Sequence, residues 1–291
     1  METLWEPLPG GWSQESFLTG VGDDLSVVRI CARPGPRGAA VAQVDASLMH
    51  LVRGLVPVPE VLEVRAAVAD APALLVTRYV PGIRGEVVLR EGSAEQRRAL
   101  GLQLGRVAGT LAGLATLRPG HFVDEDLRIG GERGDDLLAH VEERLPLLRG
   151  FDRASADRLR ALARAAQEVL DEVGRSCVVH GDLHPRNVVL DPDTRDVRAV
   201  VDWEHAHSGF PHADLGALLR FDRAPGWVEA VLSGWSAVRG EEPGLALERA
   251  RTADLVALVD LAARPAGNLV VDLAHCFLGE IVRTGDLHAW P

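Results

Sequence analysis

The fold is decided by two short stretches of sequence, HGDLHPRN at residues 180–187 and VVDWE at residues 200–204. Apolar β-forming runs flank both stretches, so a strand end, a loop and a second strand bring Asp182, Asn187 and Asp202 into one small region. Asp182 can accept the proton of an attacking hydroxyl, while Asn187 and Asp202 offer the hard oxygen ligands that Mg²⁺ prefers. The trio therefore fits metal-assisted phosphoryl transfer.

The spacing within the trio supports this chemistry. Asn187 follows Asp182 by five positions and His180 precedes it by two, as in the H-R-D-x-x-x-x-N catalytic loop of protein kinases. A structural interpretation, in which Asp182 caps a turn and Asp202 ends a strand, would explain either residue alone. The combination of all three favours the catalytic interpretation.

Upstream of this centre, residues 1–80 predict a small β-rich lobe. Apolar runs bounded by turn residues indicate strands, and apolar residues at spacings of three and four indicate one helix over residues 39–53. The predicted strands cover residues 17–21, 25–30, 61–64 and 73–80. Residues 22–24 are typical of a hairpin turn, and a Pro-Gly break places a hinge near residues 77–82.

Residues 81–291 predict a larger, mainly helical lobe. A capping-box pattern at residues 93–96 opens one helix. Further helices are expected over residues 135–149 and 155–173, and short strands over residues 177–179, 188–190 and 197–203. The last stretch of the chain, from about residue 226, is expected to be helical again, with core helices over residues 248–263 and 268–282. The sequence thus predicts an α+β protein, with a nucleotide-binding lobe over residues 1–80 and a catalytic and acceptor-binding lobe over residues 81–291.

Composition narrows the chemistry. The chain has 291 residues, a formal net charge of -11 and no lysine. Without a lysine amine it can form neither a Schiff base nor a P-loop of the G-x-x-x-x-G-K-[ST] type. The acidic balance argues against nucleic acid as a partner and is compatible with a cationic one.

The cysteines and the apolar runs bear on the compartment. Cys31, Cys177 and Cys276 are widely spaced, which predicts neither a disulfide framework nor a zinc site. The first residues show no secretory signal, and no apolar run approaches the ~20 residues of a membrane span. We therefore expect a cytoplasmic protein without a membrane partner, as a monomer or weak dimer.

Residues 178–219 resemble the aminoglycoside phosphotransferase family, which consists of small-molecule kinases with a protein-kinase-like fold. The shared pattern is H-G-D-L-H-P-x-N followed by V-D-W-E-x-A-x-x-G-x-P-x-x-D-L. The resemblance implies a bilobal fold that uses ATP, or GTP, together with Mg²⁺. It implies that Asp182 is the catalytic base and that Asn187 and Asp202 are metal ligands. His180 would shape the loop, while Asp214 is predicted to be the N-cap of the helix that follows.

A looser resemblance covers the first lobe. The stretch LPGGWSQ at residues 8–14 resembles the nucleotide loop of the family, and residues 74–82 resemble the hinge whose backbone would bind adenine. The resemblance implies nucleotide contacts by Gly10, Gly11, Ser13, Arg29, Asp45, Thr77 and Tyr79.

The sequence departs from the usual pattern of the family at four positions. Arg29 stands where lysine is common, and its guanidinium can clamp phosphate oxygens bidentately. Asp45, the helix acid expected to pair with Arg29, is one methylene shorter than the usual glutamate. Gln14 stands where asparagine is frequent, and Ala115 stands where histidine is frequent.

An acceptor pocket is expected between Asp182 and the C-terminal helices. Acidic side chains there would suit a polycationic antibiotic, either an aminoglycoside or a basic cyclic peptide of the tuberactinomycin type. The candidate contacts are Glu204, Asp254, Asp260, Asp272 and Glu280. Most acids on a helix are merely solvated, but Asp260 and Asp272 stand in apolar neighbourhoods where an unpaired carboxylate is costly.

Other interpretations stay open from the residues alone. The acceptor could be an amino alcohol or a sugar of metabolism. The histidines around Asp182 could belong to a zinc-dependent hydrolase, or the fold could be a non-catalytic binding module. We expect an O-phosphotransferase that confers antibiotic resistance, since phosphorylation adds a charge of about -1.5 to -2 to a cationic drug.

Overall fold

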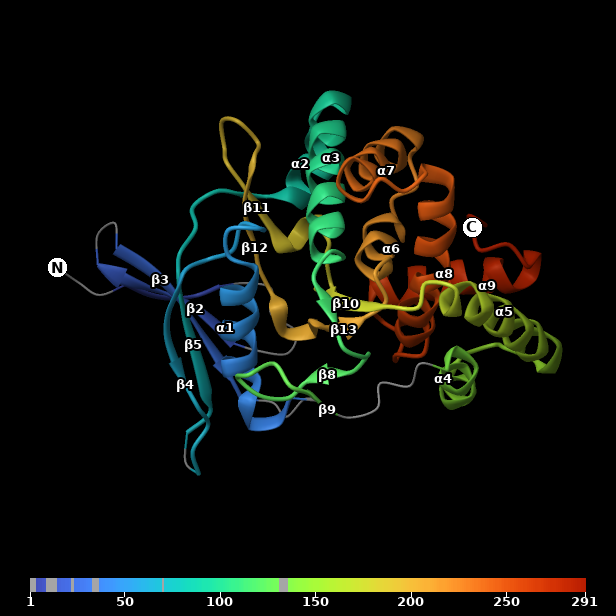
Figure 1. Ribbon diagram of the computed structural model, residues 1–291, viewed down its shortest axis with the longest axis horizontal. Helices are drawn as coiled ribbons and strands as arrows, with labels where there is room; N and C mark the ends of the chain where they lie inside the picture. Colours follow the sequence, from blue (N-terminus) through green and yellow to red (C-terminus); the bar gives the residue numbers. More distant parts are fainter. Residues whose placement is uncertain (1–3, 9–14, 22–23, 33–36, 70, 131–135) are drawn as a thin grey trace.

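The computed structural model describes residues 4–8, 15–21, 24–32, 37–69, 71–130 and 136–291. An antiparallel sheet from the N-terminal part of the chain lies beside a larger group of helices from the C-terminal part (Figure 1). This arrangement confirms the predicted α+β class with a small β-rich lobe and a larger helical one. The boundary at residue 80 stays a prediction.

The first lobe is built on a five-stranded antiparallel sheet in the order β1-β2-β3-β5-β4. The strands are β1 (Leu4–Pro7), β2 (Glu15–Val21), β3 (Asp24–Cys31), β4 (Val61–Arg65) and β5 (Ala73–Arg78). Strands β2 and β3 confirm the predicted hairpin, and they pair from Glu15 with Ile30 to Val21 with Asp24. Residues 22 and 23 of the predicted turn lie outside the described residues.

Helix α1 (Val41–Val52) packs beside this sheet and confirms the predicted helix (Figure 1). It follows a short 3-10 turn, η1 (Gly38–Ala40). Val44, Leu48 and Val52 recur at a spacing of four and are fully buried, as expected for the apolar stripe of an amphipathic helix. Beyond α1, the carbonyl of Pro57 accepts a hydrogen bond from the Val200 amide at 2.8 Å, which joins the two lobes.

Helices make up most of the second lobe. They are α2 (Gly85–Glu91), α3 (Ala94–Leu111), α4 (Leu137–Arg144), α5 (Arg153–Asp171), α6 (Ala213–Leu219), α7 (Pro225–Arg239), α8 (Pro243–Ala262) and α9 (Leu269–Thr284). The capping box at Ser93 forms as predicted, with the Ser93 amide donating to Gln96 at 2.8 Å and the Gln96 amide donating to Ser93 at 3.2 Å. No helix in the described part of the chain is long and apolar enough to cross a membrane.

One helix prediction needs correction. The helix expected to reach residue 149 ends at Arg144, because Pro146 lacks an amide hydrogen and the chain tightens into a 3-10 turn, η2 (Leu145–Leu147). Helix α7 lies in the C-terminal stretch that was expected to be helical, although its bounds were not predicted.

Helices α3 and α7 pack with unusually close backbones. An added Cβ at Gly105 would lie 2.0 Å from the carbonyl oxygen of Val231, and one at Gly234 would lie 2.1 Å from that of Leu102. Glycine is therefore required on both sides of this contact. The two helices stand side by side in Figure 1.

Two small three-stranded sheets support the centre of the molecule. In the first, β10 (Ser176–Val179) lies between β7 (Ala115–Thr116) and β13 (His207–Gly209). In the second, β11 (Val188–Leu190) lies between β6 (Ile83–Arg84) and β12 (Val197–Val200). A separate pair consists of β8 (His121–Phe122) and β9 (Ile129–Gly130). The strand expected over residues 197–203 ends at Val200.

Candidate active site

The loop between β10 and β11 carries Asp182 and Asn187. It enters β11 through a single 3-10 turn, η3 (Pro185–Asn187). The side-chain nitrogen of Asn187 donates hydrogen bonds to the Asp182 carboxylate at 2.8 Å and to the Asp182 carbonyl at 2.9 Å. These bonds hold the two residues together and leave the amide oxygen of Asn187 to serve as a ligand.

Arg186 lies in the same loop and forms an ion pair with Asp182. Its Nη2 is 3.1 Å from Asp182 Oδ2. Burial on its own would raise the pKa of Asp182, but Arg186, His180 and Asn187 together lower that pKa below its usual value. Asp182 is therefore ionised at neutral pH, which is the form that can accept a proton.

Asp214 fixes the start of this loop. Its carboxylate accepts hydrogen bonds from the backbone amides of His180 at 2.8 Å and Gly181 at 3.0 Å. The prediction that Asp214 is an N-cap was wrong, because His212 occupies that position and Asp214 lies in the first turn of α6 with its carboxylate turned to the loop. Burial raises the pKa of Asp214. The sequence pattern located this residue but gave it the wrong partner.

The backbone of Gly181 and the ring of His180 complete the loop. Gly181 has a φ of +82°, and a Cβ there would lie 2.4 Å from the carbonyl oxygen of His205. The His180 ring accepts a hydrogen bond from the Asp182 amide at 3.3 Å through Nδ1, and its Nε2 lies 3.1 Å from the Val201 carbonyl. Both ring nitrogens are thus engaged, which fits a loop-shaping role and disfavours a zinc ligand.

Asp202 leaves β12 in a left-handed backbone conformation, with φ of 70°, which is uncommon for a residue other than glycine. Its Oδ1 lies 2.9 Å from Nη2 of Arg29 on β3. Asp202 and Asp45 outweigh the effect of burial and keep the pKa of Arg29 above its usual value. The structure thus places the expected phosphate-binding cation directly against an expected metal ligand.

Asp45 pairs mainly with an arginine that the sequence did not single out. Its carboxylate contacts Arg37, whereas Arg29 Nη1 lies 3.8 Å from Asp45 Oδ2. Burial raises the pKa of Asp45 to about 6, although both arginines act to lower it. The expected pairing of Arg29 with Asp45 is therefore present only as a long contact.

Of the remaining expected nucleotide contacts, the structure describes Thr77 and Tyr79. Gly10, Gly11 and Ser13 fall outside the described residues. Thr77 lies in β5, and the Tyr79 amide just beyond it donates to the Leu25 carbonyl at 3.0 Å. The backbone of the expected hinge is thus anchored to β3.

A cavity of about 750 Å³ lies beside the catalytic loop. It is bounded by Gly181, by residues of β7, β10 and β13, and by α5, α6 and α8. Asp254 lines it, but both oxygens of this carboxylate bond to Arg220, at 2.7–3.1 Å. Much of the remaining wall is apolar, with Leu117, Leu170, Val179, Phe210 and Val256 among its residues.

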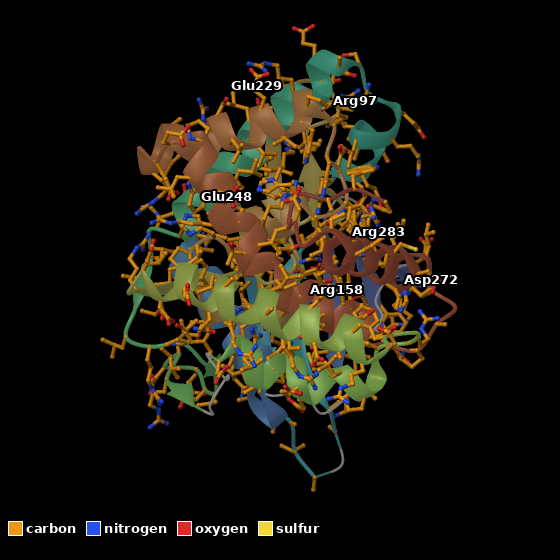
Figure 2. All side chains as sticks on the ribbon, turned by 90° about the vertical axis from the view of Figure 1, so that its right-hand side faces the viewer. Arg97, Arg158, Glu229, Glu248, Asp272 and Arg283 are labelled. Carbon is orange, nitrogen blue, oxygen red and sulfur yellow. The ribbon has the colours of Figure 1, made fainter. Side chains whose placement is uncertain are left out.

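The other acidic candidates do not line this cavity. Asp260 bonds to Arg144 at 2.8 Å, and its carboxylate is 3.4 Å from Nε2 of His140, which does line the cavity. Asp272 lies at the edge of the molecule in Figure 2, paired with Arg149 at 3.2 Å, and Glu280 pairs with its neighbour Arg283. Each is therefore neutralised by an arginine.

Glu204 stands two residues after Asp202 in the sequence and does not line the cavity. Its charge acts to raise the pKa of Arg29, after the larger effects of burial, Asp202 and Asp45. Its carboxylate is 3.5 Å from His205. This position does not favour contact with an acceptor in the cavity.

Sequence reasoning missed three arginines. Arg186 could have been found, because it stands four residues after Asp182 in the same loop. Arg37 and Arg220 could not, because their partners are set by the tertiary fold. Arg220 belongs to no motif, and Arg37 follows a Pro-Gly-Pro stretch that predicts only a loop.

Comparisons with known proteins identify a family and several relatives. A model of the phosphotransferase enzyme family matches residues 4–249. Streptomycin 3''-kinase from Streptomyces griseus is 34% identical over 182 residues, which cover 60% of this chain and 62% of that protein. Aminoglycoside 3'-phosphotransferase from Streptomyces ribosidificus is 30% identical over 224 residues, which cover 70% and 73%. Acyl-CoA dehydrogenase family member 10 from Mus musculus, 26% identical, is matched over only 16% of its length.

Solved structures show the same fold. The GDP complex of wild-type aminoglycoside 2'-phosphotransferase-IIIa has a TM-score of 0.70 at 17% identity, covering 97% of this chain and 93% of that one. A complex of a thermostable mutant of aminoglycoside phosphotransferase APH(4)-Ia with AMP-PNP and hygromycin B has a TM-score of 0.69 at 19% identity, with the same coverage. The expected protein-kinase-like fold is confirmed.

Proposed function

This chain belongs to the phosphotransferase enzyme family, and we propose that it moves the terminal phosphoryl group of a nucleoside triphosphate onto a hydroxyl group of an aminoglycoside. One observation carries the proposal. Asp182 is held as an anion by Arg186 and Asn187, in the same site as Asp202 and Arg29. The names of two relatives, a streptomycin kinase and an aminoglycoside phosphotransferase, support the choice of acceptor.

In this proposal Asp182 is the general base. The acceptor hydroxyl gives its proton to the Asp182 carboxylate while its oxygen attacks the γ-phosphorus of the nucleotide. A bond forms between that oxygen and phosphorus, and the bond from phosphorus to the β–γ bridging oxygen breaks, so that the nucleoside diphosphate leaves. Most of the acceleration comes from positioning and from charge stabilisation in the site.

Asn187 and Asp202 are the proposed ligands of Mg²⁺. An amide oxygen and a carboxylate are hard donors of the kind this ion prefers, and the hydrogen bonds of Asn187 use only its nitrogen. When bound, the ion would neutralise the charge that develops on the phosphates. Arg29 is the proposed phosphate clamp, which requires its guanidinium to leave Asp202.

The cavity beside Gly181 is the proposed acceptor site. Its volume of about 750 Å³ lies in the range of small-molecule sites. Asp171 and Asp254 line it and are the proposed contacts for amino groups of the acceptor. Asp254 also forms an ion pair with Arg220.

A donor and acceptor screen tests the acceptor class. The protein is incubated with Mg²⁺ and ATP or GTP against aminoglycosides, tuberactinomycin-type peptides, amino alcohols and sugars, and products are analysed by mass spectrometry. We expect one added phosphate on an aminoglycoside. Phosphorylation of the peptides alone, or of amino alcohols or sugars alone, would overturn the proposed acceptor, and no transfer to any acceptor would overturn the proposed function.

The Asp182→Ala variant tests the role of the base. Removing a general base costs on the order of 10²–10⁴-fold in rate, so kcat falls by at least about 100-fold. Nucleotide affinity, measured by calorimetry, stays close to that of the wild type, because Asp182 contacts Asn187 and Arg186 rather than Arg29. The matched control is Asp193→Ala, in an exposed turn, which leaves kcat unchanged. Retained turnover in Asp182→Ala would contradict the assignment.

A further inference from the structure

Arg37 is a buried cation at the junction of the two lobes. It stands just before η1 and is 6% exposed. Its Nη1 bonds to the carboxylate of Asp45, and its Nη2 bonds to the carbonyl oxygens of Trp203, at 3.2 Å, and Ala206. A buried charge needs such partners, since desolvation of an unpaired one is very costly.

The contacts of Arg37 join two elements of the site. Asp45 lies in α1 and is fully buried. Trp203 and Ala206 belong to the segment directly after Asp202, which contains the 3-10 turn η4 (Trp203–His205). The planar guanidinium fork can bond a carboxylate on one side and two carbonyls on the other, an arrangement that a lysine ammonium cannot reproduce.

Arg37 also determines what Arg29 contacts. With Oδ1 of Asp45 bonded to Arg37, Oδ2 lies 3.8 Å from Arg29 and has no hydrogen bond among the described residues. Arg29 instead reaches Asp202 at 2.9 Å. Asp45 therefore holds Arg37 in place, and Arg29 does not belong to the buried ion pair that Arg37 and Asp45 form.

From these contacts we propose that Arg37 is a positioning residue for phosphoryl transfer. It fixes the segment after Asp202 to α1, and so sets the position of Asp202. It also forms the ion pair with Asp45. Because Asp45 does not hold Arg29, Arg29 can move from Asp202 to the phosphates of the nucleotide. This inference rests on the proposed function. The sequence led us to expect that Asp45 would pair with Arg29, whereas in this proposal Asp45 pairs with Arg37 and Arg29 serves the phosphates.

Kinetics of Arg37→Met and Arg37→Lys test the proposal. We expect kcat to fall by about 100-fold in Arg37→Met, the size of effect that a misplacement of about 1 Å can cause. The Mg²⁺ concentration for half-maximal rate rises, while the KM for the acceptor stays unchanged because the cavity is not touched. Arg37→Lys keeps the charge but not the fork, so it restores only part of kcat. The matched control is Arg53→Ala, an exposed arginine just after α1 whose contact with Glu60 is 3.7 Å long.

A second readout separates this proposal from the proposed function. Hydrogen exchange of the amides of residues 203–206 is compared in the wild type, Arg37→Met and Arg53→Ala, and we expect faster exchange only in Arg37→Met. If Arg37→Met fails to fold with Asp45 left unpaired, Arg37→Met/Asp45→Leu removes both charges and is measured instead. Unchanged exchange together with unchanged kcat and Mg²⁺ dependence would overturn the role of Arg37. A wild type that phosphorylates no acceptor would overturn the proposed function, while exchange would still decide whether Arg37 fixes this segment.

Discussion

At the scale of the residue, the carboxylate of Asp214 accepts hydrogen bonds from two backbone amides, one of which belongs to a fully buried residue, His180. They belong to His180 and Gly181, immediately before Asp182. Leaving a buried donor unsatisfied costs about 1–3 kcal/mol. The geometry of the catalytic loop thus depends on one side chain from α6.

The Asp214→Ala variant is expected to lose about 1.5–3 kcal/mol in free energy of unfolding, because the buried His180 amide loses its charged acceptor. Urea denaturation measures this loss, and kcat falls with it as the loop relaxes. Asp214→Asn keeps one acceptor oxygen, so its free energy of unfolding should lie between those of the wild type and Asp214→Ala. The control is Asp152→Ala, which removes the exposed N-cap of α5 and costs about 1 kcal/mol without affecting kcat. Equal losses in both alanine variants would contradict the role given to Asp214.

The residues of the site differ in how far the sequence could predict them. Asp182 and Asn187 lie in one loop, so their spacing alone was enough to predict that they meet. Asp202 was placed by the strand that leads to it. Arg37 meets the Trp203 carbonyl across 166 positions of sequence, a contact that exists only after both lobes have folded. The arginine partners of the acidic candidates could not be predicted for a related reason, since the partner of a helix acid is set by the tertiary fold and not by the local pattern.

At the scale of the element, the contact between α3 and α7 makes a sharp prediction. A Cβ at Gly105 would meet the Val231 carbonyl at 2.0 Å, whereas one at Gly279 in α9 would meet nothing within 4 Å outside the backbone of its own helix. Gly105→Ala should lose about 1–3 kcal/mol through overpacking. Gly279→Ala should gain up to about 1 kcal/mol, because alanine favours a helix. Thermal unfolding of both variants measures the difference, and a change of the same sign in both would contradict the close packing.

Element boundaries were predictable where a local signal marks them. The capping box at Ser93 fixed the start of α3, and apolar spacing fixed α1. The end of α4 was placed too late, because the amphipathic pattern continues past Pro146 while the backbone cannot. Helix α7 was expected only as part of a helical C-terminal stretch, and its Gly234, which would weaken a helix in isolation, is needed for the contact with α3.

At the scale of the whole molecule, the fold shields two of its three thiols. Cys31 and Cys177 are buried, and Cys276 is exposed. Burial is the main cause that raises the pKa of Cys31 and of Cys177 to about 12. Because the thiolate is the reactive form, each buried thiol is ionised in only about one molecule in 10⁴ at pH 8.

Alkylation of the native protein at pH 8 should therefore add one group, at Cys276, while the urea-unfolded protein takes three. Intact-protein mass spectrometry counts the adducts. The Cys276→Ser variant serves as control and should stay unmodified in the native state. The reaction of Cys31 and Cys177 should increase as the pH rises toward their pKa. A second adduct on the native protein at the rate of the first would contradict the burial of these residues.

The second three-stranded sheet has a consequence for the alignment of the two carboxylates. Strand β6 pairs with β11, which follows the loop of Asp182, and β11 pairs with β12, which leads to Asp202. A slip of one residue between β11 and β12 would turn the side chains of one strand to the opposite face of the sheet. Val188 and Val200 are fully buried and lie opposite each other in this pairing, so a slip would also remove apolar side chains from the core. The hydrophobic core therefore keeps the Asp182 loop and Asp202 in register with each other.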